Sequence, residues 1–193
     1  MNRDILIRYF SSILPIPAER AAFFADQFVP MEFLKNDFLL KENKISKATF
    51  VLEAGYIRSY TFDNNGVEVT TNIFSAPCFV NDFLSFFKQK PTSENYQCLT
   101  PCKIWTMSYE NVQNCFHNYP EFRELGRMML VTNYSILHER MLGMIKDSAE
   151  NRYLKLLSKH PEIFQNIPLK IIASYLGITD TSLSRIRKEI AVN

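Results

Sequence analysis

The side chains best suited to recognising another molecule lie near the C-terminal end, within residues 168–190. The candidates are Thr179, Asp180, Thr181, Ser182, Ser184, Arg185, Arg187 and Lys188. An arginine can form two hydrogen bonds with a guanine edge, and hydroxyl groups bond to bases or phosphates. This short polar and basic set therefore indicates contact with double-stranded DNA.

Two short helices that cross at a steep angle would hold these side chains in place. The apolar and small residues have the required spacing: Ile172, Ala173, Leu176, Gly177, Ile178, Leu183 and Ile186. Ala173 permits close approach, and Gly177 supplies a turn with positive φ. Pro168 fits the first position of the first helix, and Thr179 or Asp180 can cap the second. The pattern predicts a helix-turn-helix; the alternative is an ordinary helical hairpin with a solvated charged face.

The second of these helices has two different faces. At about 100° per residue, Leu183, Ile186 and Ile190 form one apolar stripe, and Arg185 and Lys188 lie near the opposite side with Thr181. Ser182 and Ser184 flank that outer face. Arg187 is nearer its edge, where a phosphate contact is the more natural role.

Composition and charge support the same partner. The chain has 193 residues, 47% hydrophobic residues and a net charge of +2, enough for a substantial core. Residues 150–193 hold seven lysines and arginines against four acidic residues, so the positive charge is concentrated around the motif.

The sequence indicates a cytoplasmic protein with no membrane partner. No apolar run approaches the roughly 18 residues needed to span a bilayer, and MNRDILIRYF lacks a secretory pattern. The cysteines Cys78, Cys98, Cys102 and Cys115 form no CxxC pair, so we expect reduced structural thiols. A redox or metal site at Cys98 and Cys102 is the alternative.

The rest of the chain divides into zones of different periodicity. Residues 3–28 predict helices interrupted at Pro15 and Pro17. Residues 29–107 alternate in short runs with turns such as Asn65-Gly66, which predicts an antiparallel sandwich or barrel. A short helix over 109–116 and a long one opened by Pro120 follow, and NRYLKLLSKH predicts a further helix before the motif.

The long helix is apolar over much of its surface. Its apolar side contains Leu125, Met128, Met129, Thr132, Ile136 and Met141, and is widened by Leu130, Val131, Tyr134, Leu137 and Leu142. Such a helix must be covered on more than one face. We expect the barrel to cover one face and a second copy of the helix to cover the other; the alternative is one helix buried within a monomer.

The order helix, β-barrel, long helix and helix-turn-helix resembles the Crp/Fnr family of bacterial transcription regulators over nearly the whole chain. HPEIFQNIPLKIIASYLGITDTSLSRIRKEI looks like the C-terminal segment of Bacteroidetes-type members. LEAGYIRSY, the DNNG hairpin and PCFVNDFLSFF lie where cyclic-nucleotide-binding domains have their strands and phosphate cassette.

This resemblance implies an α+β fold in three parts. A cyclic-nucleotide-binding-like antiparallel barrel, or jelly roll, with flanking helices would occupy residues 1–118, a long dimerisation helix 119–147, and a helix-turn-helix domain 148–193. The resemblance further implies a homodimer that binds a palindromic DNA site, with recognition helices roughly 34 Å apart, contacts with RNA polymerase, and transcriptional control rather than catalysis.

Two departures from the family pattern change the expected details. Cyclic-nucleotide-binding members carry a Gly-Glu pair and, some ten residues later, an arginine followed by serine, alanine or threonine; here these positions are Asn81-Asp82 and Thr92-Ser93. Without the arginine the phosphate loses a charge-assisted contact, so we expect an effector other than cyclic AMP, or none. The chain also stops at Asn193, so we expect the winged-helix hairpin to be absent or reduced, with Lys170, Arg187 and Lys188 contributing more to affinity.

Other chemistries find little support in the sequence. The sequence has no GxSxG, GxGxxG, GxxxxGK[ST] or HExxH motif, so we expect no enzyme activity. It has no cysteine before Cys78, and its three histidines fall outside the predicted strands, so we expect no metal or cofactor. Asp82 and Glu94 establish no acid–base pair; Asp82 instead predicts a capped loop anchored by Phe83, Phe86 and Phe87. The alternative function is a ligand-binding or protein-interaction module whose helix-turn-helix no longer binds DNA, and the missing wing is the best argument for it.

Overall fold

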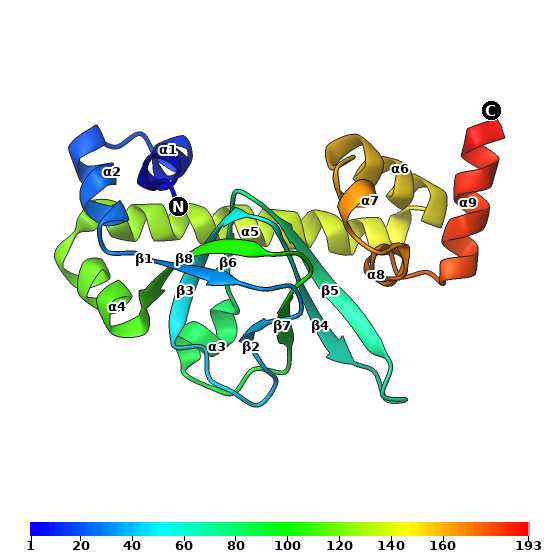
Figure 1. Ribbon diagram of the computed structural model, residues 1–193, viewed down its shortest axis with the longest axis horizontal. Helices are drawn as coiled ribbons and strands as arrows, with labels where there is room; N and C mark the ends of the chain where they lie inside the picture. The colour runs from blue at the N-terminus through cyan, green and yellow to red at the C-terminus, as the bar shows by residue number, and fades with distance from the viewer. Residues whose placement is uncertain (193) are drawn as a thin grey trace.

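A computed structural model describes residues 1–192, with side chains through residue 190 (Figure 1). In chain order the elements are α1 (Arg3–Ile13), α2 (Ala18–Ala25), β1 (Val29–Phe33), β2 (Phe38–Leu40), β3 (Ala48–Ala54), β4 (Tyr56–Phe62), β5 (Glu68–Ser75), β6 (Cys78–Val80), α3 (Phe83–Lys88), β7 (Asn95–Cys98), β8 (Cys102–Ser108), α4 (Tyr109–Asn118), α5 (Pro120–Lys146), α6 (Ala149–Lys159), α7 (Ile163–Asn166), α8 (Leu169–Tyr175) and α9 (Asp180–Val192). None of the helices in this range is long and apolar enough to cross a membrane.

The strands form two antiparallel four-stranded sheets packed as a jelly roll. Their strand orders are β1-β8-β3-β6 and β2-β7-β4-β5. The space between the sheets is filled by apolar side chains, which include Leu52, Ile57, Phe74, Val80, Tyr96 and Ile104. The expected α+β class with an antiparallel barrel, flanking helices and a long helix is confirmed.

The sequence sets the element boundaries through caps and turns. Asn2, Ser108 and Ser148 each accept a backbone N–H bond at the start of α1, α4 and α6. The predicted hairpin joins β4 to β5, with the Asp63 carboxylate accepting from the N–H groups of Asn65 and Val67. These polar side chains satisfy backbone groups that the helices and strands leave unpaired.

α5 connects the two ends of the molecule (Figure 1). It is 27 residues long and begins with Pro120 at its first position, as predicted. Phe122 and Leu125, in its first turns, are buried in an aromatic-rich core with Phe10 and Phe24 of α1 and α2. The first half of α5 is thus fixed against the barrel and the N-terminal helices, and its second half extends toward α6 and α8.

The C-terminal unit contains the expected pair of crossing helices. α8 and α9 are joined by a turn in which Gly177 has a φ of +67°, and their contact buries Ile172, Ala173, Leu176 and Leu183. Pro168 is the residue before α8, not its first residue as expected, because its ψ of 134° is extended. Thr179 caps α9, since its Oγ1 accepts from the Ser182 N–H at 3.2 Å. The expectation about the wing concerns the chain after α9 and lies outside the described residues.

Two turn glycines allow a stability test of the barrel. Gly55, between β3 and β4, has a φ of +102°, and a Cβ there would lie 2.5 Å from the Pro101 carbonyl oxygen; Gly66 has a φ of +76° and open space. We expect Gly66→Ala to lower the free energy of unfolding by about 1–2 kcal/mol, because only the backbone is strained. Gly55→Ala should lower it by about 3 kcal/mol or more, because a backbone carbonyl must also move. Urea unfolding measures both; equal losses would contradict this account of Gly55.

Candidate nucleic-acid interface

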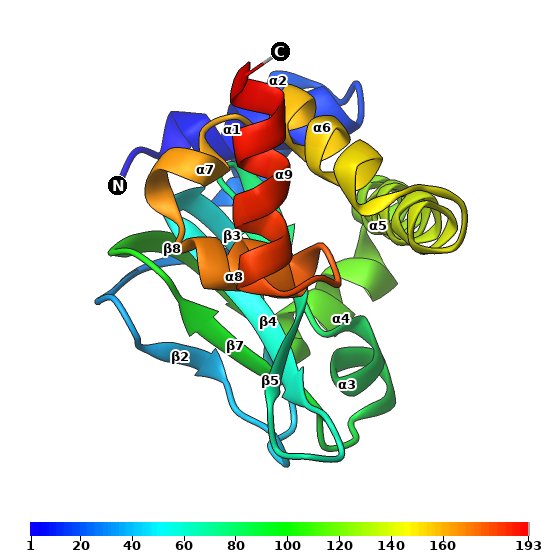
Figure 2. The same cartoon turned by 90° about the vertical axis from the view of Figure 1, so that its right-hand side faces the viewer.

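The predicted DNA-contacting side chains share one exposed surface at the end of the molecule. α9 lies at the extreme end, away from α2 and α4 (Figures 1 and 2). All eight candidates are exposed: Thr179, Asp180, Thr181, Ser182, Ser184, Arg185, Arg187 and Lys188. Leu183 of the same helix is 1% exposed and holds α9 against α8. The arrangement separates a clamped apolar side from a free polar one, as a recognition helix requires.

The start of α9 is a small network of hydroxyl groups. The Thr179 Oγ1 lies 2.9 Å from both the Thr181 Oγ1 and the Ser182 Oγ, besides capping the helix. Within the residues that the structure describes, no carboxylate oxygen lies within 4 Å of Arg185, Arg187 or Lys188. These cations are therefore not neutralised by a neighbouring acid and are available to phosphates.

The C-terminal unit is docked on the barrel through a shared core. Leu99, at the end of β7, is 7% exposed and packs in one cluster with Ile163, Ile167 and Leu176 of the C-terminal unit. Tyr56 and Ile73 of the barrel pack against the same cluster. The unit is therefore held by apolar contacts and does not depend on α5 alone for its position.

Arg140 of α5 joins the three parts of the chain at this docking site. Its guanidinium donates to the Thr71 carbonyl oxygen of β5 and to the Tyr175 carbonyl oxygen of α8, and stacks 4.4 Å from the Tyr175 ring centre. A second link is the Thr70 N–H, which donates to the Ser174 Oγ at 2.8 Å. Burial lowers the pKa of Arg140, partly opposed by Tyr175 and Glu94. Sequence reasoning missed this residue, although an arginine one turn after Ile136, on the barrel-facing side of an apolar helix, could have indicated it.

The residues predicted for an effector pocket hold local structure. Asp82 caps α3, its carboxylate accepting from the Ser85 N–H at 2.8 Å. The buried Thr92 accepts from the Glu94 N–H at 3.0 Å, and Ser93 is exposed. Asn81 directly precedes Asp82, and its buried Oδ1 has no hydrogen-bond partner among the described residues. The segment after Asp82 is the helix α3, so its prediction as a loop was wrong: one carboxylate cap and the packing of Phe86 suffice for a short turn of helix.

A carboxylate lies where the barrel approaches α5. Glu94 accepts from the Tyr96 hydroxyl at 3.0 Å and from the Thr71 hydroxyl, which also contacts the Ser59 hydroxyl at 2.7 Å. The pKa of Tyr96 is raised, first by burial and then by the Glu94 charge. Together with Asp82 at the start of α3, this negative charge opposes a phosphate in the region.

The cysteines lie apart from these surfaces. Cys98, Cys102 and Cys115 are buried free thiols, and Cys78 is half-buried with its pKa raised by burial to about 12. Across residues 1–192, no group of three or more histidine, cysteine, aspartate or glutamate side chains is placed to hold a metal ion.

A family model matches the sequence of the barrel, and solved structures resemble the chain over most of its length. Residues 30–119 match the family model described as the cyclic nucleotide-binding domain. No curated protein matches the chain in sequence. The residues matched by the family model are those that build the two sheets, α3 and α4.

Solved structures share the fold, including the long helix. The c-di-GMP-responsive global regulator CLP of Xanthomonas campestris is 16% identical with a TM-score of 0.71, covering 91% of this chain and 92% of its own. FixK2 of Bradyrhizobium japonicum is 12% identical with a TM-score of 0.72, covering 86% and 85%. A protein described as a transcriptional regulator of the crp/fnr family from Eubacterium rectale is 14% identical with a TM-score of 0.70, covering 92% and 85%. The fold is thus that of Crp/Fnr regulators.

The geometry of the barrel predicts that cyclic AMP does not bind there. The start of α3 is already capped by Asp82, position 92 is a buried threonine, and Glu94 adds a second negative charge. A cyclic phosphate would meet two carboxylates and no arginine from this loop. Titration calorimetry of the intact protein with cyclic AMP should show no saturable heat; tight, saturable binding would contradict the prediction.

Proposed function

We propose that this protein is a DNA-binding transcription regulator of the Crp/Fnr type. The observation that carries the proposal is α9, which presents a row of hydroxyl groups and three basic side chains with no ion-pair partner among the described residues, while Leu183 packs it against α8. The fold shared with Crp/Fnr regulators supports the same function. In this role Arg185 contacts a base edge, Thr181 and Lys188 contact bases or phosphates, and Arg187 and Lys170 bind the DNA backbone.

An exposed apolar stripe along α5 supports a homodimer as the active form. Leu130, Tyr134, Leu137 and Met141 recur at intervals of four, three and four residues, and all are exposed, Tyr134 by 68% and Leu137 by 62%. That spacing is typical of the seam of a left-handed two-helix coiled coil. The stripe lies on the opposite side of α5 from Leu125, so a second copy of α5 can cover it without disturbing the barrel. Such a dimer would present two α9 helices to one palindromic site.

The proposed barrel function is regulation rather than catalysis. Its interior is filled by apolar and aromatic side chains, and its loop groups are engaged in local hydrogen bonds. An effector other than cyclic AMP, or none, fits this arrangement. RNA polymerase remains a partner expected from the fold alone.

DNA binding should depend on salt and on the exposed basic residues of α9. We expect the affinity for a palindromic site, selected from genomic fragments, to fall steeply as salt rises, because cations on the protein displace counterions from the DNA. Arg185→Ala should cost about 1–3 kcal/mol and relax the choice of one base, whereas Lys188→Ala should weaken all sequences alike. Lys103→Ala, an exposed lysine of β8 on the barrel, is the matched control. If both α9 variants bind every fragment as tightly as the parent, the interaction-module alternative is favoured.

The dimer proposal predicts that a charge in the α5 stripe releases monomers. In Leu137→Glu two carboxylates would face each other across the seam, so sedimentation should show a large shift toward the monomer. Ser135→Glu is the control, because Ser135 is exposed on the same helix but lies outside the stripe. A Leu137→Glu protein that remains a dimer would show that α5 is not the interface.

A further inference from the structure

A cleft lies between the second half of α5, α6 and the end of α8. Its volume is about 570 Å³, and it is bordered by Ile136, Arg140 and Gly143 of α5, by Lys155 and Lys159 of α6, and by Tyr175 and Leu176 beside α8. A volume of this size is typical of sites for small organic molecules. The cleft is on the side of α5 that faces the barrel, opposite the stripe proposed for dimerisation, so dimer formation does not require it.

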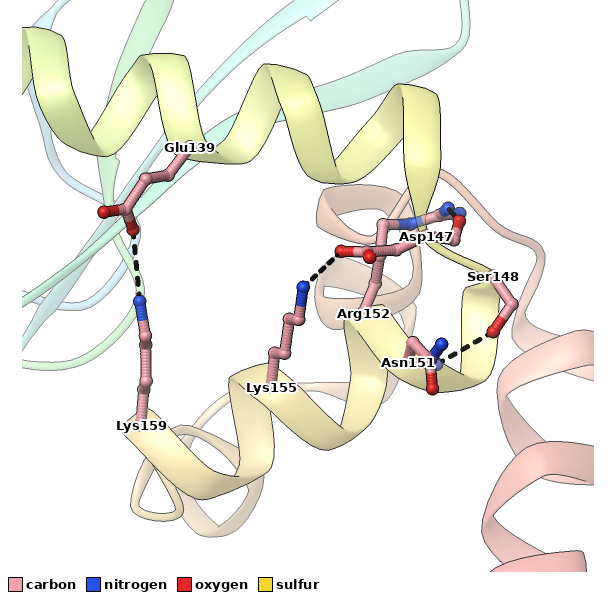
Figure 3. Close-up of polar contacts among 7 residues, drawn as sticks. All are labelled: Glu139, Asp147, Ser148, Asn151, Arg152, Lys155 and Lys159. Atoms are coloured by element: carbon pink, nitrogen blue, oxygen red, sulfur yellow. Dashed lines mark hydrogen bonds and ion pairs between the residues drawn. The ribbon is translucent and has the colours of Figure 1, made fainter.

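Few contacts hold the two walls of the cleft together. From α6, Lys155 reaches Asp147 at 2.7 Å, and Lys159 reaches Glu139 at 3.2 Å across the opening (Figure 3). Lys159 and Glu139 are about two thirds exposed, so their ion pair contributes little to stability. At the closed end, Arg152 donates to the carbonyl oxygens of Asp147 and Leu176. The cleft is thus closed at one end by the bonds of Arg152 and bridged at the other by an exposed ion pair.

The cleft carries an excess of positive charge. Arg140, Lys146, Arg152, Lys155 and Lys159 line it, against the two carboxylates of Glu139 and Asp147. Both acids are already paired with lysines. In the range covered by the structure no carboxylate oxygen lies within 4 Å of the cations of Arg140, Lys146 or Arg152. Arg140 and Arg152 are half-buried and bond only to neutral carbonyl groups, so an entering anion would be attracted.

The remaining surface of the cleft is apolar. Ile136, Leu142, Met144, Leu156 and Leu176 contribute aliphatic groups, and Tyr175 contributes a ring. Ile136 and Met144 are 54% and 42% exposed in the empty cleft. Covering them would add hydrophobic binding energy of about 25 cal/mol per Å² to the attraction of charge.

We propose that this cleft is a binding site for a small amphipathic organic anion, outside the barrel. Its carboxylate, sulfonate or phosphate group would lie near Lys155, Lys159 and the guanidinium of Arg152, and its apolar body would cover Ile136 and Leu156. Because α5 and α6 form opposite walls, the bound molecule would brace the C-terminal unit against the long helix. The site goes beyond the proposed function and does not require that α9 binds DNA.

Filling the cleft provides a test with a matched control. Gly143 lines the cleft from inside α5, and a Cβ there would meet only the Asp147 carboxylate, at 3.2 Å. Gly143→Leu places a branched side chain in the cleft, whereas Gly143→Ala adds one methyl group; both are good helix formers, so helix stability should change alike. Thermal melting of both variants confirms that they fold.

The probe is anilinonaphthalene sulfonate, whose fluorescence reports binding of an anion with an aromatic body. For the intact protein we expect saturable binding at one site per chain. Gly143→Leu should weaken it by about tenfold or more, and Gly143→Ala by less than about twofold. The double variant Lys155→Gln/Lys159→Gln should weaken it several-fold, and Lys47→Gln/Lys103→Gln, on the barrel surface, should leave it unchanged.

Two results would overturn the proposal: no saturable binding by the parent protein, or equal affinities for the Gly143→Leu and Gly143→Ala variants, which would place the probe elsewhere. DNA affinity is measured separately without the probe. If the protein binds the probe in the cleft but does not bind DNA, the result supports this site and contradicts the proposed function. If it binds DNA but shows no saturable binding of the probe, the result supports the proposed function and contradicts this site.

Discussion

The docking of the C-terminal unit on the barrel sets the position of the α9 surface and of the cleft. It combines an apolar cluster containing Leu99 and Leu176 with the hydrogen bonds that Arg140 makes to β5 and α8. A pair of short helices of this size would bury little apolar surface if it were isolated. The core that it shares with the barrel supplies additional buried apolar surface. The orientation of α9 is therefore a property of the whole chain.

α5 is the element on which the two ends of the molecule depend. At 27 residues it is about 40 Å long, enough to run along the barrel and continue to the C-terminal unit. Its sides differ in chemistry: Phe122 and Leu125 enter the main core, Arg140 faces the docking site, and Tyr134 and Leu137 are exposed. This explains why its amphipathicity is weak, because a helix with several apolar partners has no single polar side.

The features that the sequence predicted well depend on neighbours along the chain. The α8–α9 pair, the β4–β5 hairpin and the start of α5 at Pro120 follow from caps, turn residues and short periodicities. The errors were also local: Pro168 lies one residue before α8, and Asp82 caps a helix where a loop was predicted. At these positions a few hydrogen bonds decide between closely related conformations, and the sequence pattern does not resolve them.

What could not be predicted depends on residues distant in sequence. Arg140 donates hydrogen bonds to the carbonyl oxygen of Thr71, 69 positions earlier, and to that of Tyr175, 35 positions later. The hydrophobic periodicity of the sequence does not predict contacts between residues so far apart. The cleft likewise exists only because α6 returns alongside α5 after the turn at Asp147 and Ser148. The exposure of the candidates on α9 could be predicted because it follows from the periodicity of one helix, whereas the contacts of Glu94 and Arg140 depend on tertiary structure.

The position of Arg140 also constrains how any ligand could control α9. A ligand shifts a conformational equilibrium only by binding one state more tightly than the other. A molecule in the barrel would have to act on α8 across the contacts of Thr70, Thr71 and Arg140, because the space between the sheets is already filled. A molecule in the cleft would contact α5, α6 and α8 together. It would therefore lose contacts if the C-terminal unit separated from α5, and it would bind the docked arrangement more tightly. Because such a molecule would contact the long helix and the C-terminal unit directly, the cleft is a shorter route from a ligand to α9 than the barrel is.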